Sequence, residues 1–323
     1  MRWPVFSSNN LIPLLMKSIS ILLALTLLTS CTSRKAEPES VSNNPEPEAI
    51  SFSGKPLYAK VADSAAVVKS DSLVAAIRSK TDLSEDDFIA IGRSMVGISR
   101  FKKAVEIYSE GLGKYPNSYK LLRHRGHRYI NLRQLENAMP DLLKAEELIR
   151  PEPEVYEYDA AGKQGATYQH QIWYHIGLYH FLKRDYAPSA AAFEKSLATA
   201  HAGGDRAGSS DWLYNAYMRM GLTDKAAAIA RPFTADFDIE NKDYPYYRRL
   251  LLFNGVIKPE ELVDASKPIA EMTLLEMTKL YGLANWRAYQ GDAETANALY
   301  KKILESTEWA GFAYASAELD VTN

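Results

Sequence analysis

Apolar residues recur along most of the chain at the three- and four-residue spacing of amphipathic helices. Over 88–116, "FIAIGRSMVGISRFKKAVEIYSEGLGKYP", this spacing predicts two helices separated by a short turn. The small residues of this first copy return 34 positions later, where Gly92, Ala104 and Gly111 are matched by Gly126, Ala138 and Ala145. Small residues at a fixed period predict stacked helical hairpins in which the two helices approach each other closely.

Later copies of the pattern are less regular. A third hairpin, "WYHIGLYHFLKRDYAPSAAAFEKSL", follows an insertion over 151–168, and two more copies read "WLYNAYMRMGLTDKAAAIA" and "YGLANWRAYQGDAETANALYKKIL". Ala226 and Ala296 are 70 residues apart, close to two periods, so we expect a degenerate helix pair between them, built from "YPYYRRLLLFNG" and "KPEELVDA". The terminal "EWAGFAYASAELD" predicts a capping helix, which the open end of a solenoid requires. No strand-period segment competes, so we predict an all-α solenoid of about five to six helix pairs.

A short apolar run near the start of the chain precedes the only cysteine. Lys17 is followed by "SISILLALTLL" and then by "TSC", which ends at Cys31. An apolar core of about ten residues is typical of an export signal and is too short to span a membrane. The residues at 28–31, "LTSC", resemble the lipobox of bacterial lipoproteins. This resemblance implies cleavage before Cys31, lipid attachment to its thiol and a signal peptide over 1–30.

The remaining organisation follows from composition and from the repeats. Met16 directly precedes Lys17 and is the expected true start of the signal peptide. The stretch after the cysteine is rich in Ser, Pro, Glu and Asn and predicts a disordered tether. The expected order is a tether over 31–55, lead-in helices over 56–84, repeats 1 and 2 over 85–150, the insertion over 151–168, and repeat 3 onward with the degenerate pair and capping helix over 169–323.

The repeats themselves resemble those of the tetratricopeptide repeat (TPR) superfamily. The template positions in the first copy are Phe88, Ile91, Gly92, Met95, Ala104, Tyr108 and Pro116. The layout of lipobox, tether, two clear repeats, "WLY" helix pair, degenerate pair and closing repeat is similar to that of the family of new lipoprotein I, an enterobacterial envelope protein. This resemblance implies an outer-membrane adaptor that docks envelope hydrolases or proteases and has no catalysis of its own. Thr32, rather than Asp, follows the cysteine, which favours an outer-membrane lipoprotein facing the periplasm and leaves surface exposure open.

Charge and chemistry narrow the function further. Without 1–30 the chain has 36 basic and 40 acidic residues, a formal charge of −4, which disfavours nucleic acid as a partner. His124 and His127 have no third ligand at a suitable spacing, and no nucleophile elbow or phosphate loop is present in the sequence. The acidic stretch "PEPEVYEYD" in the insertion is expected to be a solvated loop. We therefore expect no catalytic residue, no metal and no cofactor.

One ion pair is expected inside the second repeat. Arg125 stands directly before the repeat glycine, where the template calls for a large apolar residue, so it needs a carboxylate partner. Asp141 lies on the facing helix and is the expected partner.

Two candidate binding surfaces follow from the helices that should line the groove of the solenoid. The first is basic and could bind an acidic segment or be a solvated face; its members are Arg93, Lys120, Arg123, His127 and Asn131. The second is aromatic and consists of Tyr174 and Phe181, unless the capping helix covers them.

The sequence thus favours a non-catalytic, lipid-anchored scaffold that binds a protein or peptide partner. The alternative is a solute- or glycan-capture lipoprotein in which the 151–168 insertion forms the site. A homodimer is left open.

We expect a Cys31→Ala protein to lose both its lipid and its membrane association, because the thiol is the implied attachment point. Palmitate labelling followed by immunoprecipitation measures this, and labelling equal to that of the wild type would contradict it. A truncated protein that begins at about Ser53 is expected to be soluble and helical.

Overall fold

The structure, a computed structural model, describes residues 46–159 and 161–322. The predicted signal peptide and Cys31 lie outside the described residues. In chain order the elements are β1 Ala49–Ile50, β2 Pro56–Leu57, α1 Ser64–Arg78, α2 Glu85–Gly97, α3 Phe101–Lys114, α4 Tyr119–Asn131, α5 Leu135–Ile149, β3 Tyr156–Tyr158, β4 Gln164–Thr167, α6 Tyr168–Leu182, α7 Tyr186–Ala198, α8 Gly203–Arg219, α9 Thr223–Ala230, α10 Pro245–Phe253, α11 Pro259–Leu262, the 3-10 turn η1 Ile269–Glu271, α12 Leu274–Tyr289, α13 Ala293–Ile303 and α14 Phe312–Asp320.

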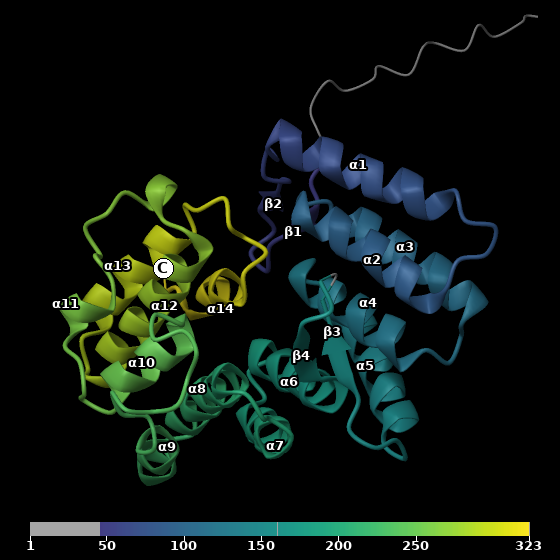
Figure 1. Cartoon of the computed structure of the whole chain (residues 1–323). Helices are drawn as coiled ribbons and strands as arrows, with labels where there is room; N and C mark the ends of the chain where they lie inside the picture. The colour runs from purple at the N-terminus through teal and green to yellow at the C-terminus, as the bar shows by residue number, and fades with distance from the viewer. Residues whose placement is uncertain (1–45, 160, 323) are drawn as a thin grey trace, which may run out of the picture. The chain divides into compact units, whose positions relative to one another are not determined.

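Consecutive helices pack as hairpins that stack on one another (Figure 1). The pairs are α2 with α3, α4 with α5, α6 with α7, α8 with α9, and α12 with α13. The first helices of the early pairs, α2, α4, α6 and α8, contact one another in turn and form what we call the inner face. The expected all-α TPR solenoid is therefore confirmed. Within the described ranges, no helix is long and apolar enough to cross a membrane.

Glycine sets the crossing of the two helices in the α2–α3 and α6–α7 hairpins. A Cβ atom at Gly92 would lie 2.2 Å from Cε1 of Tyr108, and one at Gly177 would lie 2.8 Å from the ring of Phe193. Both distances are far shorter than a van der Waals contact, so only glycine lets the aromatic ring of the second helix reach the backbone of the first. The 34-residue period of small residues thus has a packing cause.

The N-terminal part of the body differs from the expectation of a disordered tether up to residue 55. Residues of the expected tether form β1, which pairs antiparallel with β2, with Ala49 opposite Leu57. Both residues are buried, and the Phe52 N–H donates to Glu318 at 3.0 Å. The disorder predicted up to residue 55 is therefore wrong for the hairpin, because a partner distant in sequence orders it. A truncated protein that begins at about Ser53 would lose β1.

The insertion differs from its prediction, whereas the degenerate pair and the lead-in segment contain expected helices. The insertion forms an antiparallel hairpin, β3–β4, instead of a solvated loop. The degenerate pair consists of α10, which packs on α8 and α12, and the four-residue α11. Of the one or two expected lead-in helices the segment forms one, α1, which packs on α2.

The C-terminal segment does more than cap the last repeat. α14 packs on α12 and α13 as expected, and it also contacts α6 on the inner face. Just before it, the Ala310 carbonyl accepts a hydrogen bond from Asn131 Nδ2 at 2.7 Å, and the Trp309 indole N–H donates to the Tyr58 carbonyl at 2.5 Å. The end of the chain therefore covers part of the inner face and joins the second repeat to the N-terminal segment.

The ion pair expected in the second repeat is present. Arg125 Nε and Nη2 donate to the two Asp141 carboxylate oxygens at 2.7 and 2.8 Å, and Nη1 donates to Ser109 Oγ at 3.0 Å. The ion pair joins α4 to α5, and the hydrogen bond to Ser109 links α4 to α3 as well.

We expect Asp141→Ala to lower the free energy of unfolding by about 1.5–3 kcal/mol. A fully buried pair costs about 3–5 kcal/mol to break, but 22 % of the Arg125 side chain is exposed and can rehydrate. Urea unfolding measures the change. The control is Glu147→Ala, which breaks the exposed pair with Lys144 and should cost less than about 1 kcal/mol. Equal losses in the two proteins would contradict the prediction.

Candidate binding site

Two of the expected basic residues meet on one carboxylate of the β3–β4 hairpin. Arg93 Nη1 on α2 lies 3.2 Å from Glu157 Oε1, and Arg123 on α4 forms an ion pair with Glu157 Oε2. His124 Nε2 lies 3.2 Å from Glu157 Oε1. We call Arg93, Arg123, His124 and Glu157 the Glu157 cluster. In the sequence Glu157 is one of several acidic residues in the insertion, and nothing there distinguishes it.

The charges of the Glu157 cluster follow from its burial. Burial alone would raise the pKa of Glu157, but Arg123 and His124 outweigh it and hold this pKa well below its usual range. Burial, aided by the Arg123 charge, lowers the pKa of His124 to about 4. Arg123 Nη1 lies 3.1 Å from His124 Nδ1 and can only donate a hydrogen bond, so Nδ1 is the acceptor. The proton of the neutral His124 ring is therefore on Nε2, which faces the carboxylate. At neutral pH the cluster holds an ionised Glu157 and a neutral His124.

The other expected basic-face residues contact parts of the same chain. Lys120 Nζ lies 3.1 Å from Asp86 Oδ1 and 3.5 Å from Glu85 Oε1. The His127 ring lies 4.0 Å from that of His175 and 5.3 Å from that of Phe312, between centroids. Asn131 is buried below Ala310. The structure thus brings the predicted residues together on the inner face but covers most of them.

The predicted aromatic surface is part of the packing between repeats. Phe181 is 3 % exposed, and its ring lies 5.4 Å from that of Tyr186 and 4.9 Å from that of Trp212. The Tyr174 hydroxyl accepts a hydrogen bond from the Trp212 indole N–H at 2.8 Å. Helix α8, rather than the capping helix, covers this surface. Its Trp212 finds there both an aromatic contact and an acceptor for the indole N–H, which a buried tryptophan needs.

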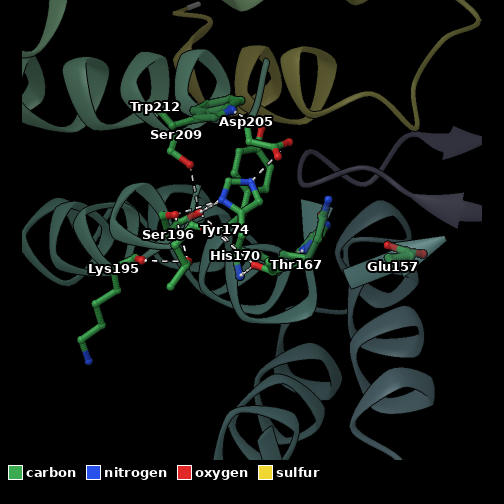
Figure 2. A network of polar contacts seen from close by, with 12 residues as sticks. Glu157, Thr167, His170, Tyr174, Lys195, Ser196, Asp205, Ser209 and Trp212 are labelled. Carbon is green, nitrogen blue, oxygen red and sulfur yellow. Dashed lines mark hydrogen bonds and ion pairs between the residues drawn. The ribbon is translucent and has the colours of Figure 1, made fainter. Parts of the chain in front are cut away.

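A serine, a histidine and an aspartate lie together where α6, α7 and α8 meet (Figure 2). His170 Nδ1 lies 2.9 Å from the Ser196 carbonyl and 3.2 Å from Ser196 Oγ, and Nε2 lies 3.9 Å from Asp205 Oδ1. A carbonyl oxygen only accepts, so Nδ1 carries the proton and gives the hydroxyl no base. Ser196 is fully buried and donates to the His170 carbonyl at 3.1 Å. This arrangement holds three helices together and is not set up for nucleophilic catalysis.

A mainly apolar cavity with a volume of about 860 Å³ lies between α1, α2 and the β3–β4 hairpin. Most of its lining is apolar and includes Leu73 of α1, Ala90 of α2, and Tyr156 and Tyr158 of β3. Leu73 is 43 % and Tyr158 56 % exposed, so the cavity is open to solvent. We call it the α1–α2 cavity. The sequence did not indicate it, because two of its three walls, α1 and the hairpin, lie outside the repeat pattern.

Charged groups stand at the edge of the α1–α2 cavity. Arg93 belongs both to this edge and to the Glu157 cluster, and Lys69 and Asp86 also line the cavity. Among the described side chains, no group of three or more His, Cys, Asp or Glu residues is placed to hold a metal ion. The α1–α2 cavity has the apolar walls and the charged edge of a binding surface.

The chain has a TPR fold. No family model matches it, and no curated protein does. Among solved structures, it is similar to a tetratricopeptide repeat protein from Parabacteroides merdae ATCC 43184, at 17 % identity over 77 % of this chain and 92 % of that chain, with a TM-score of 0.47. It is also similar to MamA of AMB-1, at 12 % identity over 59 % of this chain and 96 % of that chain, with a TM-score of 0.38. A third similar structure is that of the APC/C hetero-tetramer Cut9–Hcn1. The identity is 14 % over 75 % of this chain and 46 % of that chain, with a TM-score of 0.30.

We expect the neutral state of His124 to make stability depend on pH. Its folded pKa of about 4 lies below the unfolded value of 6.5, so between these values only the unfolded chain takes up the proton. Stability is therefore lost as the pH falls below about 6.5, by about 1.4 kcal/mol per pH unit. From pH 7 to pH 5, His124→Gln should lose about 2 kcal/mol less than the wild type.

Urea unfolding at the two pH values measures this difference. The matched control is His201→Gln, since the His201 side chain is 48 % exposed, and this protein should keep the pH dependence of the wild type. If His124→Gln has the pH dependence of the wild type, His124 does not contribute to the pH dependence of stability.

Proposed function

We propose that this protein is a non-catalytic, lipid-anchored TPR adaptor that binds a protein or peptide partner in the bacterial cell envelope, at the α1–α2 cavity. The observation that carries this proposal is the cavity itself. Its volume of about 860 Å³ is in the range of ligand pockets, its lining is mainly apolar, and exposed Leu73 and Tyr158 flank its opening.

The α1–α2 cavity is also a part of the inner face that the described residues leave open. Over α4 and α6, the hairpin and the C-terminal segment already occupy the surface through Glu157, Ala310 and Phe312. Over α2 the inner face remains accessible between α1 and the hairpin. A partner segment with two or three apolar side chains would bury them there and leave its polar groups at the charged edge.

The envelope location rests on the sequence. The export signal, the lipobox-like residues that end at Cys31 and the tether support an outer-membrane lipoprotein facing the periplasm. Three acyl chains at about 0.8 kcal/mol per buried methylene would hold the adaptor on its membrane.

A second candidate is capture of a solute or glycan. The observation in its favour is that the insertion forms one wall of the cavity with Tyr156 and Tyr158, whose rings could stack on sugars. The mainly apolar lining favours the peptide, because sugar hydroxyls need many polar partners. Thermal melting of the soluble body with envelope oligosaccharides separates the two candidates. A rise in the melting temperature that Ala90→Trp abolishes would support capture.

We expect a photo-reactive benzoylphenylalanine in place of Leu73 to cross-link a partner in intact envelopes, because Leu73 stands at the opening of the cavity. Ala90→Trp should abolish this cross-link, since Ala90 lines the cavity and the indole would fill part of it. Immunoblotting of irradiated cells measures both results.

The matched control places the photo-reactive residue at Leu143 on α5, which is 51 % exposed but lies outside the cavity. It should give no such product. Circular dichroism must show that the Ala90→Trp protein is folded. A cross-link that persists in the folded Ala90→Trp protein would rule out the cavity as the binding site.

A further inference from the structure

The inner face carries more positive charge than the described residues neutralise. The guanidinium groups of Arg93 and Arg123 contact Glu157, and the nearby Arg128 forms an ion pair with no described carboxylate. Arg123 is 5 % and Arg128 8 % exposed, and the Nε atom of each lacks a hydrogen-bond partner. A buried charge without a counter-ion is costly. Burial accordingly lowers the pKa of Arg128 to about 10. The described residues therefore leave part of the positive charge in this region without a counter-ion.

The hairpin that supplies Glu157 has few other attachments to the inner face. Tyr158 is exposed, the turn over 161–163 is exposed, and most of β4 is exposed or half-buried. The Glu157 side chain, in contrast, is only 14 % exposed. A two-stranded hairpin is marginally stable by itself. The Glu157 cluster thus provides much of the attachment of β3–β4 to α2 and α4.

The sequence around Glu157 also joins the two parts of the site. Glu157 points to Arg93 and Arg123, while its neighbours Tyr156 and Tyr158 line the α1–α2 cavity. An acidic residue between aromatic residues therefore already occupies both the anion site and the apolar wall.

We propose that Glu157 is an internal ligand, and that the site formed by Arg93, Arg123 and His124 also binds an Asp or Glu side chain of a partner peptide, which displaces the β3–β4 hairpin. The partner is thus a segment in which an acidic residue is flanked by aromatic or other apolar residues. This inference rests on the proposed function and names the chemistry of the partner. It also assigns the insertion a role as a built-in competitor.

The test uses the folded body, residues 46–323, and a fluorescent peptide that contains Tyr-Glu-Tyr between glycine and serine residues. Fluorescence anisotropy should show binding about tenfold tighter to Glu157→Gln than to the wild type, because the internal competitor is weakened. A Tyr-Gln-Tyr peptide should bind neither protein measurably. Binding of the acidic peptide should weaken between low and high salt, since screening acts on the ion pairs.

The matched control is Glu154→Gln, which removes a nearby carboxylate whose partner is the exposed His201. It should bind the acidic peptide with wild-type affinity. Equal affinities of the wild type and Glu157→Gln, or equal binding of the two peptides, would overturn the proposal.

A second measurement needs no variant and decides the case if Glu157→Gln does not fold. Saturating acidic peptide should accelerate tryptic cleavage of the wild type after Lys163 in the hairpin turn, and the Tyr-Gln-Tyr peptide should not. An unchanged cleavage rate would overturn the proposal. A negative result in these peptide experiments would not affect the cross-link at Leu73, so the proposed adaptor function would stand. If instead the peptide binds as expected but the Leu73 cross-link persists in Ala90→Trp, only the cavity as the adaptor site is overturned.

Discussion

The arrangement of the whole body depends on the buried ion pair between Arg133 and Glu318. Arg133 occupies the turn between α4 and α5 with a left-handed backbone, φ 63°, and its side chain and that of Glu318 are each 3 % exposed. Arg133 Nη2 also donates to the Trp309 carbonyl at 2.7 Å, and Glu318 accepts from the Phe52 N–H. One pair of charges therefore joins the second repeat, the C-terminal helix and the N-terminal hairpin. Removing one partner of such a pair leaves an uncompensated buried charge, at a cost of about 3–5 kcal/mol.

This closure determines which surface is left for binding. An open TPR solenoid would present the first helices of its repeats along one groove. Here the C-terminal segment lies on α4 and α6, where Phe312 contacts His127 and the Ala310 carbonyl contacts Asn131. The hairpin adds Glu157 over α2 and α4. Among the described residues, the α1–α2 cavity remains accessible, and its apolar walls meet Arg93 there.

The two halves of the candidate site, the α1–α2 cavity and the Glu157 cluster, would bind a partner through different interactions. The cavity offers apolar area, whose burial contributes about 25 cal/mol per Å² and tolerates many side chains. The Glu157 cluster offers buried guanidinium groups, which discriminate strongly between a carboxylate and an uncharged group. An adaptor with both parts can bind through the first and select through the second.

The sequence by itself determined the solenoid, because each repeat is a local pattern: Gly92 and Tyr108 are sixteen residues apart, and their contact explains why a small residue recurs. It also determined the Arg125–Asp141 pair, whose partners lie within one repeat. Only the tertiary structure decided the candidate site. Arg93 meets Glu157 across 64 residues and Arg133 meets Glu318 across 185, through an insertion and a terminal segment that follow no period. Such contacts depend on how distant segments fold back over the repeats, and local residue patterns carry no information about that.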